Sequence, residues 1–574
     1  MTDLLKVYEG LKFGPAGMKD GPRERAMEAG ALVEVEATSL VGYRSAGYLL
    51  VVGPEQEALA AAAAIGPALH RTVLVTEDAH ELDEAAAAAR DDPALSVIRG
   101  RPAGISGHLG KFTARMQVAE GGDLNLSELN GTAHPWFDLV LDLQSIPALG
   151  MEVPPFGYYA PRGDPDRLQR ALAEIPEMTG EFEKPKFFNY SPDICAHGDS
   201  GLTGCTRCMD ACPTNAITSL GDLIEVDPYL CQGGGSCAAA CPTGAIIYAY
   251  PTPKDQLARV RAMLTAFRDA GGTRPVLLFH DEEHGLETLQ ALAPTLPGNV
   301  VPVQVAEIGA VGMDIWLASL AYGASAVWLL DTPAVARSVR GELEAQQSYV
   351  EPILEALGLA RDRIRMVTVI QDLGADAEAV AEPVAAAAFD TFNEKRGTLR
   401  LAIDHLREHA TQPAEQVGLP KGAPFGQVLV DAQSCTLCMA CPQVCPTNAL
   451  GDAGDKPQLN FTEDLCVQCG LCRQACPEDA ITLQPRYLFD WEQRRRPRVA
   501  NEEEPFCCVS CGKPFATASV IERMTDRLQD HHMFKSEESL RRLKMCGDCR
   551  VMDMFAEEMR DVTGPRVFGM GSDK

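Results

Sequence analysis

Short apolar runs alternate with helical patterns along the first third of the chain. Continuous apolar runs at residues 48–53 and 72–76 predict buried strands, and the alanine-rich stretch 54–64 between them predicts a helix. Another strand is predicted at residues 137–142. Because alternating strands and helices are typical of α/β folds, residues 1–190 are expected to form an α/β domain.

The same alternation returns in the middle of the chain. Apolar runs at residues 275–279 and 299–305 predict strands, and mixed strand and helix patterns continue to residue 372. Residues 253–425 are therefore expected to form a second α/β domain. Helical patterns are predicted at residues 254–270, 375–388 and 398–409.

Two cysteine runs near the end of the chain share the spacing Cys-x2-Cys-x2-Cys-x3-Cys-Pro. This doubled run is typical of a bacterial dicluster ferredoxin module, in which the fourth cysteine of each run ligates the cluster held by the other run. Such a module is expected at residues 426–490. The predicted ligands are Cys435, Cys438, Cys441 and Cys476 for one [4Fe–4S] cluster, and Cys466, Cys469, Cys472 and Cys445 for the second.

An incomplete copy of the pattern lies upstream, at residues 191–252. Leu202 and Gly234 stand where the pattern has cysteines, and Cys195 lies near enough along the chain to replace the first of them. Glycines at 233–235 would let the backbone approach a cluster closely. The predicted ligands are Cys195, Cys205, Cys208 and Cys241 for one cluster, and Cys212, Cys231 and Cys237 for the other.

Three cysteines leave the second of these sites open to three outcomes. The site could hold [3Fe–4S], it could hold [4Fe–4S] with a non-cysteine fourth ligand, or it could hold no cluster. His197, Asp193 and Asp199 are nearby candidates for the fourth ligand. An open iron corner could also bind a substrate as a Lewis acid.

The last cysteines form two further Cys-x2-Cys pairs. Two such pairs suit tetrahedral Zn²⁺ in a closed structural site, so residues 491–574 are expected to form a zinc-knuckle-like domain. Another iron–sulfur cluster and free thiols are the alternatives. Cys507 has no partner in this scheme and is expected to be a buried small residue. The predicted metal ligands are Cys508, Cys511, Cys546 and Cys549.

Charge and composition bear on partners and location. A formal net charge of −29 argues against nucleic acid and is compatible with docking to a basic patch on a redox partner. The short basic stretch 494–498 is expected to be a solvated linker. The sequence begins without a signal-peptide pattern and contains no apolar run of about 18 residues, so a cytoplasmic protein without a membrane span is expected. There its twenty cysteines stay reduced and available to metals.

The cysteine motifs resemble those of prokaryotic polyferredoxin-like "4Fe–4S binding proteins". The resemblance rests on the stretch from Cys195 to Cys208, on Cys231-Gln-Gly-Gly-Gly-Ser-Cys237, and on the two complete runs at 435–477. These motifs cover about a quarter of the chain. They are specific for the binding of iron–sulfur clusters, and much less specific for the metabolic pathway in which the protein acts. The resemblance implies a larger oxidoreductase as partner, with formate dehydrogenase as the candidate.

Residues 275–332 are similar to the delta subunit of methyl-viologen-reducing hydrogenase. The matching stretches are Pro-Gly-Asn-Val-Val-Pro-Val-Gln-Val at 297–305 and Tyr-Gly-Ala-Ser-Ala-Val-Trp-Leu-Leu at 322–330. That subunit holds a [2Fe–2S] cluster with cysteines, whereas this chain has no cysteine between Cys241 and Cys435. The resemblance implies a retained fold without the cluster. At the positions that correspond to the cluster cysteines, this chain has His280, His284, Glu307 and Asp331 or Thr332. The first three of these residues could form a replacement metal site.

The predicted fold class is a multidomain α+β chain. Two dicluster ferredoxin modules are separated by an α/β domain, with an α/β domain before them and a four-cysteine domain after them. The predicted function is relay of single electrons between a larger oxidoreductase and another acceptor. Two alternatives stay open: a redox-sensing or maturation factor for a metalloenzyme, and an oxidoreductase with an organic cofactor in the N-terminal domain.

No catalytic residue is assigned from the sequence. The chain lacks a recognisable nucleophile–base pair, a Walker loop and a Rossmann fingerprint. Glycines scattered over residues 104–110 indicate a plain turn, with a phosphate or flavin loop as the alternative.

Overall fold

The computed structural model describes residues 4–8, 10–14, 21–117, 122–129, 134–369, 373–454 and 456–563. The chain divides into two compact units. Unit 1 comprises Met1–Cys195 and Thr206–Pro413, and unit 2 comprises Ala196–Cys205 and Ala414–Lys574. A ten-residue piece of the first cysteine region is thus grouped with the C-terminal part of the chain.

The N-terminal part of unit 1 contains a parallel five-stranded sheet. Strand β2 (Tyr48–Gly53) is apolar along its length because helices and loops cover both faces of the sheet. Leu49 and Val51 enter the core on one face, and Leu50 and Val52 enter the core on the other. In spatial order the strands are β4 (Ser96–Arg99), β3 (His70–Val75), β2 (Tyr48–Gly53), β8 (Leu139–Asp142) and β9 (Tyr158–Tyr159), with helices α3 (Glu55–Ile65), α4 (Glu84–Arg90) and α6 (Pro165–Glu174).

Two antiparallel elements accompany this sheet. The strands β1 (Leu40–Ser45) and β10 (Gly180–Pro185) pair along their full lengths, and β5 (Pro102–Ser106), β6 (Thr113–Gln117) and β7 (Asp123–Asn125) form a small sheet. Residues 107–111 form the turn between β5 and β6, where Gly107 and Gly110 have φ of 115° and 80°. The stretch 104–110 is therefore strand and turn, without the strand-to-helix context of a phosphate loop.

The middle of unit 1 contains a second parallel sheet. Its four strands are buried along most of their length, and Leu277, Phe279 and Trp316 are fully buried. In spatial order they are β18 (Val300–Gln304), β17 (Val276–His280), β19 (Ala326–Leu330) and β20 (Ile364–Val367). The helices are α9 (Pro253–Asp269), α10 (His284–Leu292), α11 (Met313–Ala321), α12 (Arg337–Ala356), α13 (Leu373–Ala379) and α14 (Lys395–Glu408).

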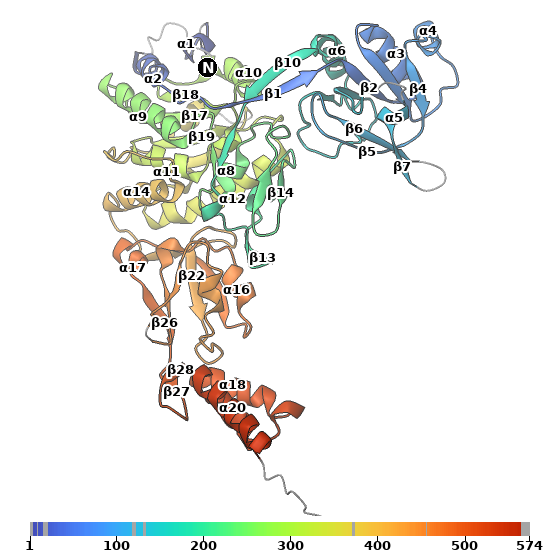
Figure 1. Cartoon of the computed structure of the whole chain (residues 1–574). Helices are drawn as coiled ribbons and strands as arrows, with labels where there is room; N and C mark the ends of the chain where they lie inside the picture. The colour runs from blue at the N-terminus through green and yellow to red at the C-terminus, as the bar shows by residue number, and fades with distance from the viewer. Residues whose placement is uncertain are drawn as a thin grey trace, which may run out of the picture. The chain divides into compact units, whose positions relative to one another are not determined.

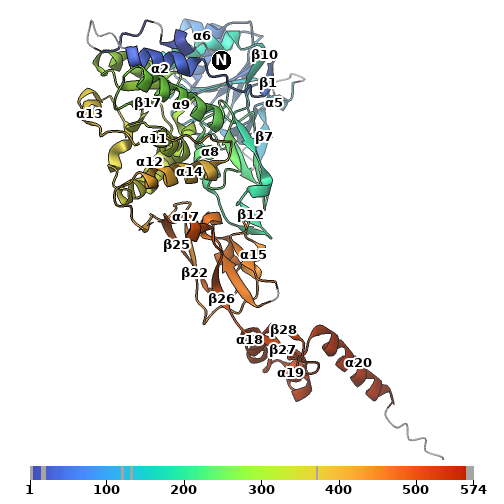
Figure 2. The same ribbon diagram turned by 90° about the vertical axis from the view of Figure 1, so that its left-hand side faces the viewer.

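Helix α9 illustrates how local sequence signals set an element. Thr252 caps its first turn by accepting a hydrogen bond from the backbone N–H of Asp255, and Pro253 occupies the first helical position. The helix packs against α2 (Gly21–Ala31), which lies beside it in both views (Figures 1 and 2). The N-terminal segment is thereby attached to the middle sheet.

The two ferredoxin modules share one topology. In the first, β11 (Phe188–Tyr190) pairs with β16 (Ile246–Tyr248), and β14 (Ile217–Ser219) pairs with β15 (Ile224–Val226). In the second, the equivalent pairs are β22 (Gly426–Val430) with β25 (Ile481–Leu488), and β23 (Leu450–Asp452) with β24 (Gln458–Phe461). One cysteine of each run lies in a short helix: α7 (Arg207–Asp210), α8 (Ser236–Ala240), α15 (Ala440–Gln443) and α16 (Leu471–Ala475).

Unit 2 also contains the end of the chain and one hairpin from the first cysteine region. Strands β21 (Gln416–Gly418) and β26 (Arg498–Glu502) extend the second module. The remaining elements are the hairpin β12 (Gly198–Asp199) with β13 (Leu202–Thr203), helix α17 (Trp491–Arg495), the hairpin β27 (Pro505–Cys507) with β28 (Pro514–Thr517), and helices α18 (Ala518–Leu528), α19 (Glu537–Leu543) and α20 (Gly547–Thr563).

Two expectations about secondary structure were wrong. The helix expected at residues 375–388 ends at Ala379, because Pro383 disfavours a helical backbone in the residue before it. The basic stretch 494–498 is not a solvated linker: Arg494 is 4% exposed and lies 3.6 Å from the Asp464 carboxylate. Among the described residues, no helix combines the length and apolar character required to cross a lipid bilayer.

Candidate metal centres

Four thiols from two separate runs converge in the second module. The loop that carries three of them passes through left-handed conformations at Leu437 and Met439, with φ of 53° and 58°, and therefore curls around a common space. Cys438 is exposed, so one edge of this group reaches the surface. The four cysteines that line this small cavity are Cys435, Cys438, Cys441 and Cys476.

The other four cysteines of this module form a second buried group. Burial, together with negative charge on Cys466 and Cys445, raises the pKa of Cys469 to about 11. The pKa of Cys472 is raised by burial and by the same neighbours. Thiolates held this close in an apolar interior repel each other, so they ionise together only around a cation. The group has the donor chemistry of an iron–sulfur cluster.

Hydrogen-bond donors lie beside the cysteine of each Cys-Pro pair. In the pair Cys476-Pro477, the residue that follows is Glu478 and not threonine. Here the backbone N–H of Ala480 donates to Cys476 Sγ at 3.3 Å. A hydroxyl that donates to a thiolate stabilises its negative charge and so influences the reduction potential of a bound cluster. The hydroxyl–sulfur distances are 3.4 Å for Thr214–Cys212, 3.5 Å for Thr243–Cys241 and 3.8 Å for Thr447–Cys445.

The three-cysteine group of the first module lies in unit 1. Burial raises the pKa of Cys237 well above its ordinary value, and Cys231 and Cys212 contribute like charge nearby. All three pack in one core with Ile217 and Ile246, which are 6% and 1% exposed. The apolar residues after each Cys-Pro pair pack in one core with the cysteines in both modules.

The loop around Gly234 keeps the backbone conformation of its complete counterpart. Gly233 and Gly235 have φ of 82° and 74°, and the equivalent Gln468 and Gly470 have φ of 55° and 89°. Gly234 itself has no positive φ. A Cβ built on it would lie 3.3 Å from Pro213 Cγ and 3.8 Å from Val339 Cγ2. The first module therefore lacks the thiol but not the loop.

Lys184 is a neighbour of this group that sequence reasoning missed. Its Nζ donates to the backbone oxygens of Cys231 at 2.6 Å and of Tyr229 at 3.1 Å. Burial lowers the pKa of Lys184 to about 8, against the opposing influence of Cys231 and Asp227. Lys184 lies 47 positions from Cys231 and on strand β10, so no local motif could have indicated it. The repeated Cys-Pro-Thr triplet, in contrast, could have indicated the threonines.

The remaining cysteines of the first module are divided between the two units. Cys195, Cys208 and Cys241 pack in the core of the first module in unit 1, whereas Cys205 is grouped with unit 2. Cys205 is three residues from Cys208 along the chain. The assignment of all four to one cluster stays a prediction.

The candidate fourth ligands of the three-cysteine site have other surroundings. His197 is 2% exposed and donates through Nδ1 to the backbone oxygen of Cys205, within unit 2. Asp193 is exposed. Asp199 accepts a hydrogen bond from Ser200 at 2.6 Å. The identity of a fourth ligand stays a prediction.

The C-terminal cysteines form a compact group. The sulfur atoms of Cys508, Cys511, Cys546 and Cys549 all lie within 4.8 Å of one another. Tetrahedral ligands about 2.3 Å from one zinc ion lie about 3.8 Å apart, and Cys511 Sγ lies 3.7 Å from Cys546 Sγ. A cubane cluster holds its thiolates further apart, because an iron corner separates each sulfur from the centre. The spacing fits a single metal ion.

Backbone donors also prepare this group for a cation. Burial opposes ionisation of Cys508, but N–H groups of Cys546 and Ser510 lower its pKa to about 6. The pKa of Cys549 is raised to about 12 through its hydrogen bond with Cys511, since unbound thiols must share protons. Cys507, expected to be buried, is exposed at the end of β27.

The replacement metal site at His280, His284 and Glu307 does not form. Both ring nitrogens of His280 are occupied, by the Tyr8 hydroxyl at 2.8 Å and by the Asp281 backbone oxygen at 2.9 Å. His284 pairs instead with Glu287 at 3.6 Å. In the part of the chain that the structure describes, the C-terminal cysteines are the one group of at least three histidine, cysteine or acidic side chains whose ligand atoms lie this close together.

Comparison with known families bears on both cysteine regions. Residues 203–245 and 430–481 each match a family described as a 4Fe–4S dicluster domain. The chain carries two 4Fe–4S dicluster ferredoxin domains. The matches lie within the two modules described above, and they leave the two α/β sheets and the C-terminal cysteines unassigned.

Three curated relatives are similar over short segments. Hydrogenase-4 component A of Escherichia coli is 38% identical over 56 residues, which is 10% of this chain and 25% of the relative. An isethionate sulfite-lyase activating enzyme of Oleidesulfovibrio alaskensis is 40% identical over 76 residues, 12% of this chain and 25% of the relative. One component of an ion-translocating oxidoreductase complex of Methanosarcina acetivorans is 39% identical over 54 residues, 9% of this chain and 20% of the relative. The chain thus spans a quarter or less of each relative.

Proposed function

We propose that this chain is an iron–sulfur protein that relays single electrons between a larger oxidoreductase and a second acceptor. The observation that supports this most directly is the convergence of Cys435, Cys438, Cys441 and Cys476 on one cavity, although two separate runs supply them. Iron–sulfur clusters, when bound, accept and release one electron at a time. The two dicluster domains support the same function.

The chain's own residues would hold and tune the clusters. Buried aliphatic side chains such as Leu450 and Ile481 would exclude water from the thiolates, and the threonine hydroxyls would donate to thiolate sulfur. Lys184 places a positive charge beside the three-cysteine site, which favours its reduced state. The proposed ligand sets are Cys435/Cys438/Cys441/Cys476, Cys445/Cys466/Cys469/Cys472, Cys195/Cys205/Cys208/Cys241 and the incomplete Cys212/Cys231/Cys237.

A contact within unit 2 supports a connection from the first ligand region to the second module. The loop of residues 196–205 packs on α16, where Gln474 Nε2 donates to the Thr203 backbone oxygen at 2.6 Å. A Cβ on Gly204 would lie only 2.6 Å from Leu471 Cγ, so the backbone approaches the helix closely. Cys205 is near enough to raise the pKa of Cys469 by its charge. We propose that electrons pass between the modules at Cys205 and Cys469.

The exposed Cys438 edge is the proposed site of exchange with a partner. The net charge of −29 would direct the protein toward a basic surface on that partner, where the exposed Cys438 edge could dock. Two relatives are named as a hydrogenase component and an ion-translocating oxidoreductase subunit, which supports a larger oxidoreductase as partner. Formate dehydrogenase is the candidate from the polyferredoxin resemblance. A cytoplasmic location and a hydrogenase-delta-like middle domain complete the proposal.

The C-terminal cysteines would hold structural zinc. Their sulfur spacing and their donor set of four thiolates suit one tetrahedral ion, and iron in the same geometry is the competitor. The domain they stabilise contacts the cluster-binding loop: Thr517 Oγ1 donates to the Thr436 backbone oxygen at 3.0 Å, and Arg523 pairs with Glu478 at 2.5 Å. The zinc site would thereby fix α18 beside the exposed cluster edge.

Metal analysis of anaerobically purified full-length protein tests the proposal. We expect about fifteen or sixteen iron atoms with matching sulfide, and one zinc, per chain. Cys472→Ser should lower the iron content by up to about four atoms, whereas Cys507→Ser, at an exposed position outside every ligand set, should leave it unchanged. Fewer than about eight iron atoms in the wild type, or an equal effect of both variants, would contradict the assignment.

The incomplete site favours one second candidate, a redox sensor. A cluster held by Cys212, Cys231 and Cys237 alone would be the most labile in the chain. Oxygen would destroy it first, so its loss could act as the signal that oxygen is present. Stepwise exposure to air, followed by EPR and partner pull-down, separates the two functions. A sensor changes partner binding when this cluster is lost; an electron carrier changes only its electron-transfer rate.

A further inference from the structure

A cavity of about 410 Å³ lies in unit 1, at the carboxyl ends of two strands of the middle sheet. Gln304 is the last residue of β18, Val305 follows it, and Glu282 lies two residues beyond the end of β17. Ligands of open parallel sheets bind at this edge, and the volume is typical of small-molecule sites. None of the proposed cluster ligands lines the cavity.

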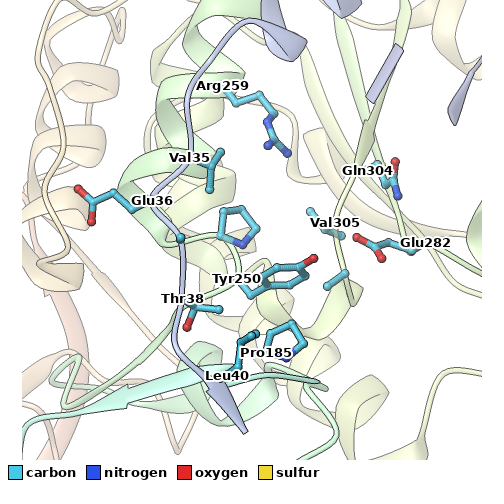
Figure 3. A pocket seen from close by; sticks show the side chains of 13 residues that line it. Val35, Glu36, Thr38, Leu40, Pro185, Tyr250, Arg259, Glu282, Gln304 and Val305 are labelled. Atoms are coloured by element: carbon cyan, nitrogen blue, oxygen red, sulfur yellow. The ribbon is translucent and has the colours of Figure 1, made fainter. Parts of the chain in front are cut away.

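Arg259 is buried at this cavity without an acceptor. It is 5% exposed, and among the described residues it forms no hydrogen bond or ion pair, with Nε buried and unpartnered. Figure 3 shows its side chain extending from α9 toward the space above Tyr250. Burial lowers the pKa of Arg259, against the opposing influence of negative charge on Tyr8, Asp255 and Glu282. A buried guanidinium without a partner costs free energy, which a bound anion would recover.

The other side of the cavity offers hydrogen-bond acceptors. Gln304 is 8% exposed, and its Oε1 is buried with no partner in the described part of the chain. The carboxylate of Glu282 faces the same space at the rim (Figure 3). The Gln304 oxygen lacks an N–H or O–H donor, and the Glu282 carboxylate can accept from one. The cavity is therefore polarised, with a cation on one side and acceptors on the other.

Apolar side chains and a connecting segment enclose the space between these groups. Residues 35–40 cross the cavity between α2 and β1 and contribute Val35 and Leu40 to its wall (Figure 3). The segment is held at both ends: the Glu36 backbone N–H donates to Asp255 at 3.2 Å, and Thr38 Oγ1 donates to the Lys186 backbone oxygen at 2.7 Å. A carbon skeleton would be covered on several sides.

We propose that this cavity binds a small organic monocarboxylate that carries an N–H or O–H donor at its other end. Arg259 pairs with the carboxylate, Gln304 and Glu282 accept from the donor, and the apolar wall packs on the carbon skeleton. A dianionic phosphate fits poorly, because one guanidinium faces it while Glu36 and Glu282 repel it. The proposal assigns unit 1 a ligand in addition to electron transfer.

Calorimetric titration of the full-length protein with lactate, propionate and inorganic phosphate tests the proposal. Lactate has both a carboxylate and a hydroxyl donor, and propionate has the carboxylate alone. Phosphate has no carbon skeleton, and its dianion carries two negative charges. We expect lactate to bind most tightly and phosphate most weakly. Arg259→Gln should weaken lactate binding by about tenfold or more, and Gln304→Leu should weaken lactate but not propionate.

Arg261→Gln is the matched control, because Arg261 lies on the same helix and pairs with Asp390 outside the cavity. Iron content and melting temperature are measured for each variant, since Arg259 is buried. Should Arg259→Gln fail to fold, Glu282→Gln at the rim replaces it and should strengthen propionate binding. The proposal is overturned if phosphate binds as tightly as lactate, if the cavity variants bind as the wild type does, or if lactate does not bind the wild type.

Discussion

Gly234 and Cys469 occupy the same position of the same loop in the two ferredoxin modules. Each is flanked by two residues of positive φ, so the backbone that presents the Cys469 thiol is retained around Gly234. The repeat differs here by a side chain and not by a fold. The difference is reversible by one substitution.

Gly234→Cys is expected to supply the missing thiolate. The new Cβ meets Pro213 Cγ at 3.3 Å, a tight contact that a small shift of the proline ring relieves. We expect the iron content to rise by at most about one atom per chain and a [3Fe–4S] EPR signal of the oxidised wild type to disappear. Gly341→Cys adds a thiol at an open position of α12 and should change neither. Unchanged spectra in Gly234→Cys would exclude this corner as a ligand position.

Thr214→Val should lower the reduction potential of the three-cysteine site. The hydroxyl of Thr214 lies 3.4 Å from Cys212 Sγ, and its donation favours the more negatively charged reduced cluster. Valine keeps the volume of the side chain and removes the donor, so a fall of roughly tens of millivolts is expected in an EPR-monitored redox titration. Thr218→Val, at an exposed position of β14, is the control. A potential unaffected by Thr214→Val would show that the hydroxyl does not donate to sulfur.

Much of this architecture could be predicted, because local patterns encode it. The strand at residues 48–53 is continuously apolar, as a buried parallel strand requires, and the strand at residues 300–304 is buried along its whole length. The helix predicted at residues 254–270 begins one residue early, at a proline. The cysteine spacing likewise identified both ferredoxin modules. The convergence of the C-terminal thiols followed from two Cys-x2-Cys pairs.

The rest could not be predicted, because it depends on residues distant in sequence. Lys184 lies on strand β10 and donates a hydrogen bond to Cys231, which is distant in sequence. Arg494 is buried and pairs with the Asp464 carboxylate, 30 positions away, although the basic residues around it predict a solvated segment. The cavity at Arg259 combines the connector at 35–40 with strand ends beyond residue 280. No window of the sequence contains such a site.

Cys511→Ser should release the C-terminal metal and destabilise the domain around it. Loss of one of four ligands leaves three thiolates that repel each other unless they are protonated. We expect zinc to fall to a small fraction of one per chain, with faster proteolysis of α18–α20 and an unchanged iron content. Cys507→Ser, next to the first pair but exposed, should keep the zinc. Retained zinc in Cys511→Ser, or iron lost in parallel with zinc, would contradict a separate zinc site.

Gly204→Ala tests the proposed connection between modules. An added methyl group would lie 2.6 Å from Leu471 Cγ and 2.9 Å from the Ala196 backbone oxygen, so the loop must move away from α16. We expect both modules to keep their clusters while electron equilibration between them slows, measured by freeze-quench EPR after rapid reduction. Gly451→Ala, with no atom within 4 Å of its new Cβ, is the control in the same unit. Equal rates in both variants would rule out this route.

His280 makes the stability of the middle sheet dependent on pH. Its Nδ1–H donates to the Asp281 backbone oxygen, so Nε2 is the acceptor for the Tyr8 hydroxyl at 2.8 Å. Burial lowers the pKa of His280 from 6.5 to about 4, and the unfolded chain therefore binds the proton more readily than the folded one. Stability is full above pH 6.5 and is lost as the pH falls toward 4, by up to about 3 kcal/mol.

The measurement is thermal unfolding of the full chain, together with hydrogen exchange at β17, over that pH range. His280→Gln removes the titrating ring, so its melting temperature should depend less steeply on pH than that of the wild type, whatever its absolute value. His284→Gln changes an exposed histidine of the adjoining helix and should keep the wild-type slope. If the two variants have the same slope, protonation of His280 does not govern the acid sensitivity of this sheet, and Tyr8 must accommodate the charged ring.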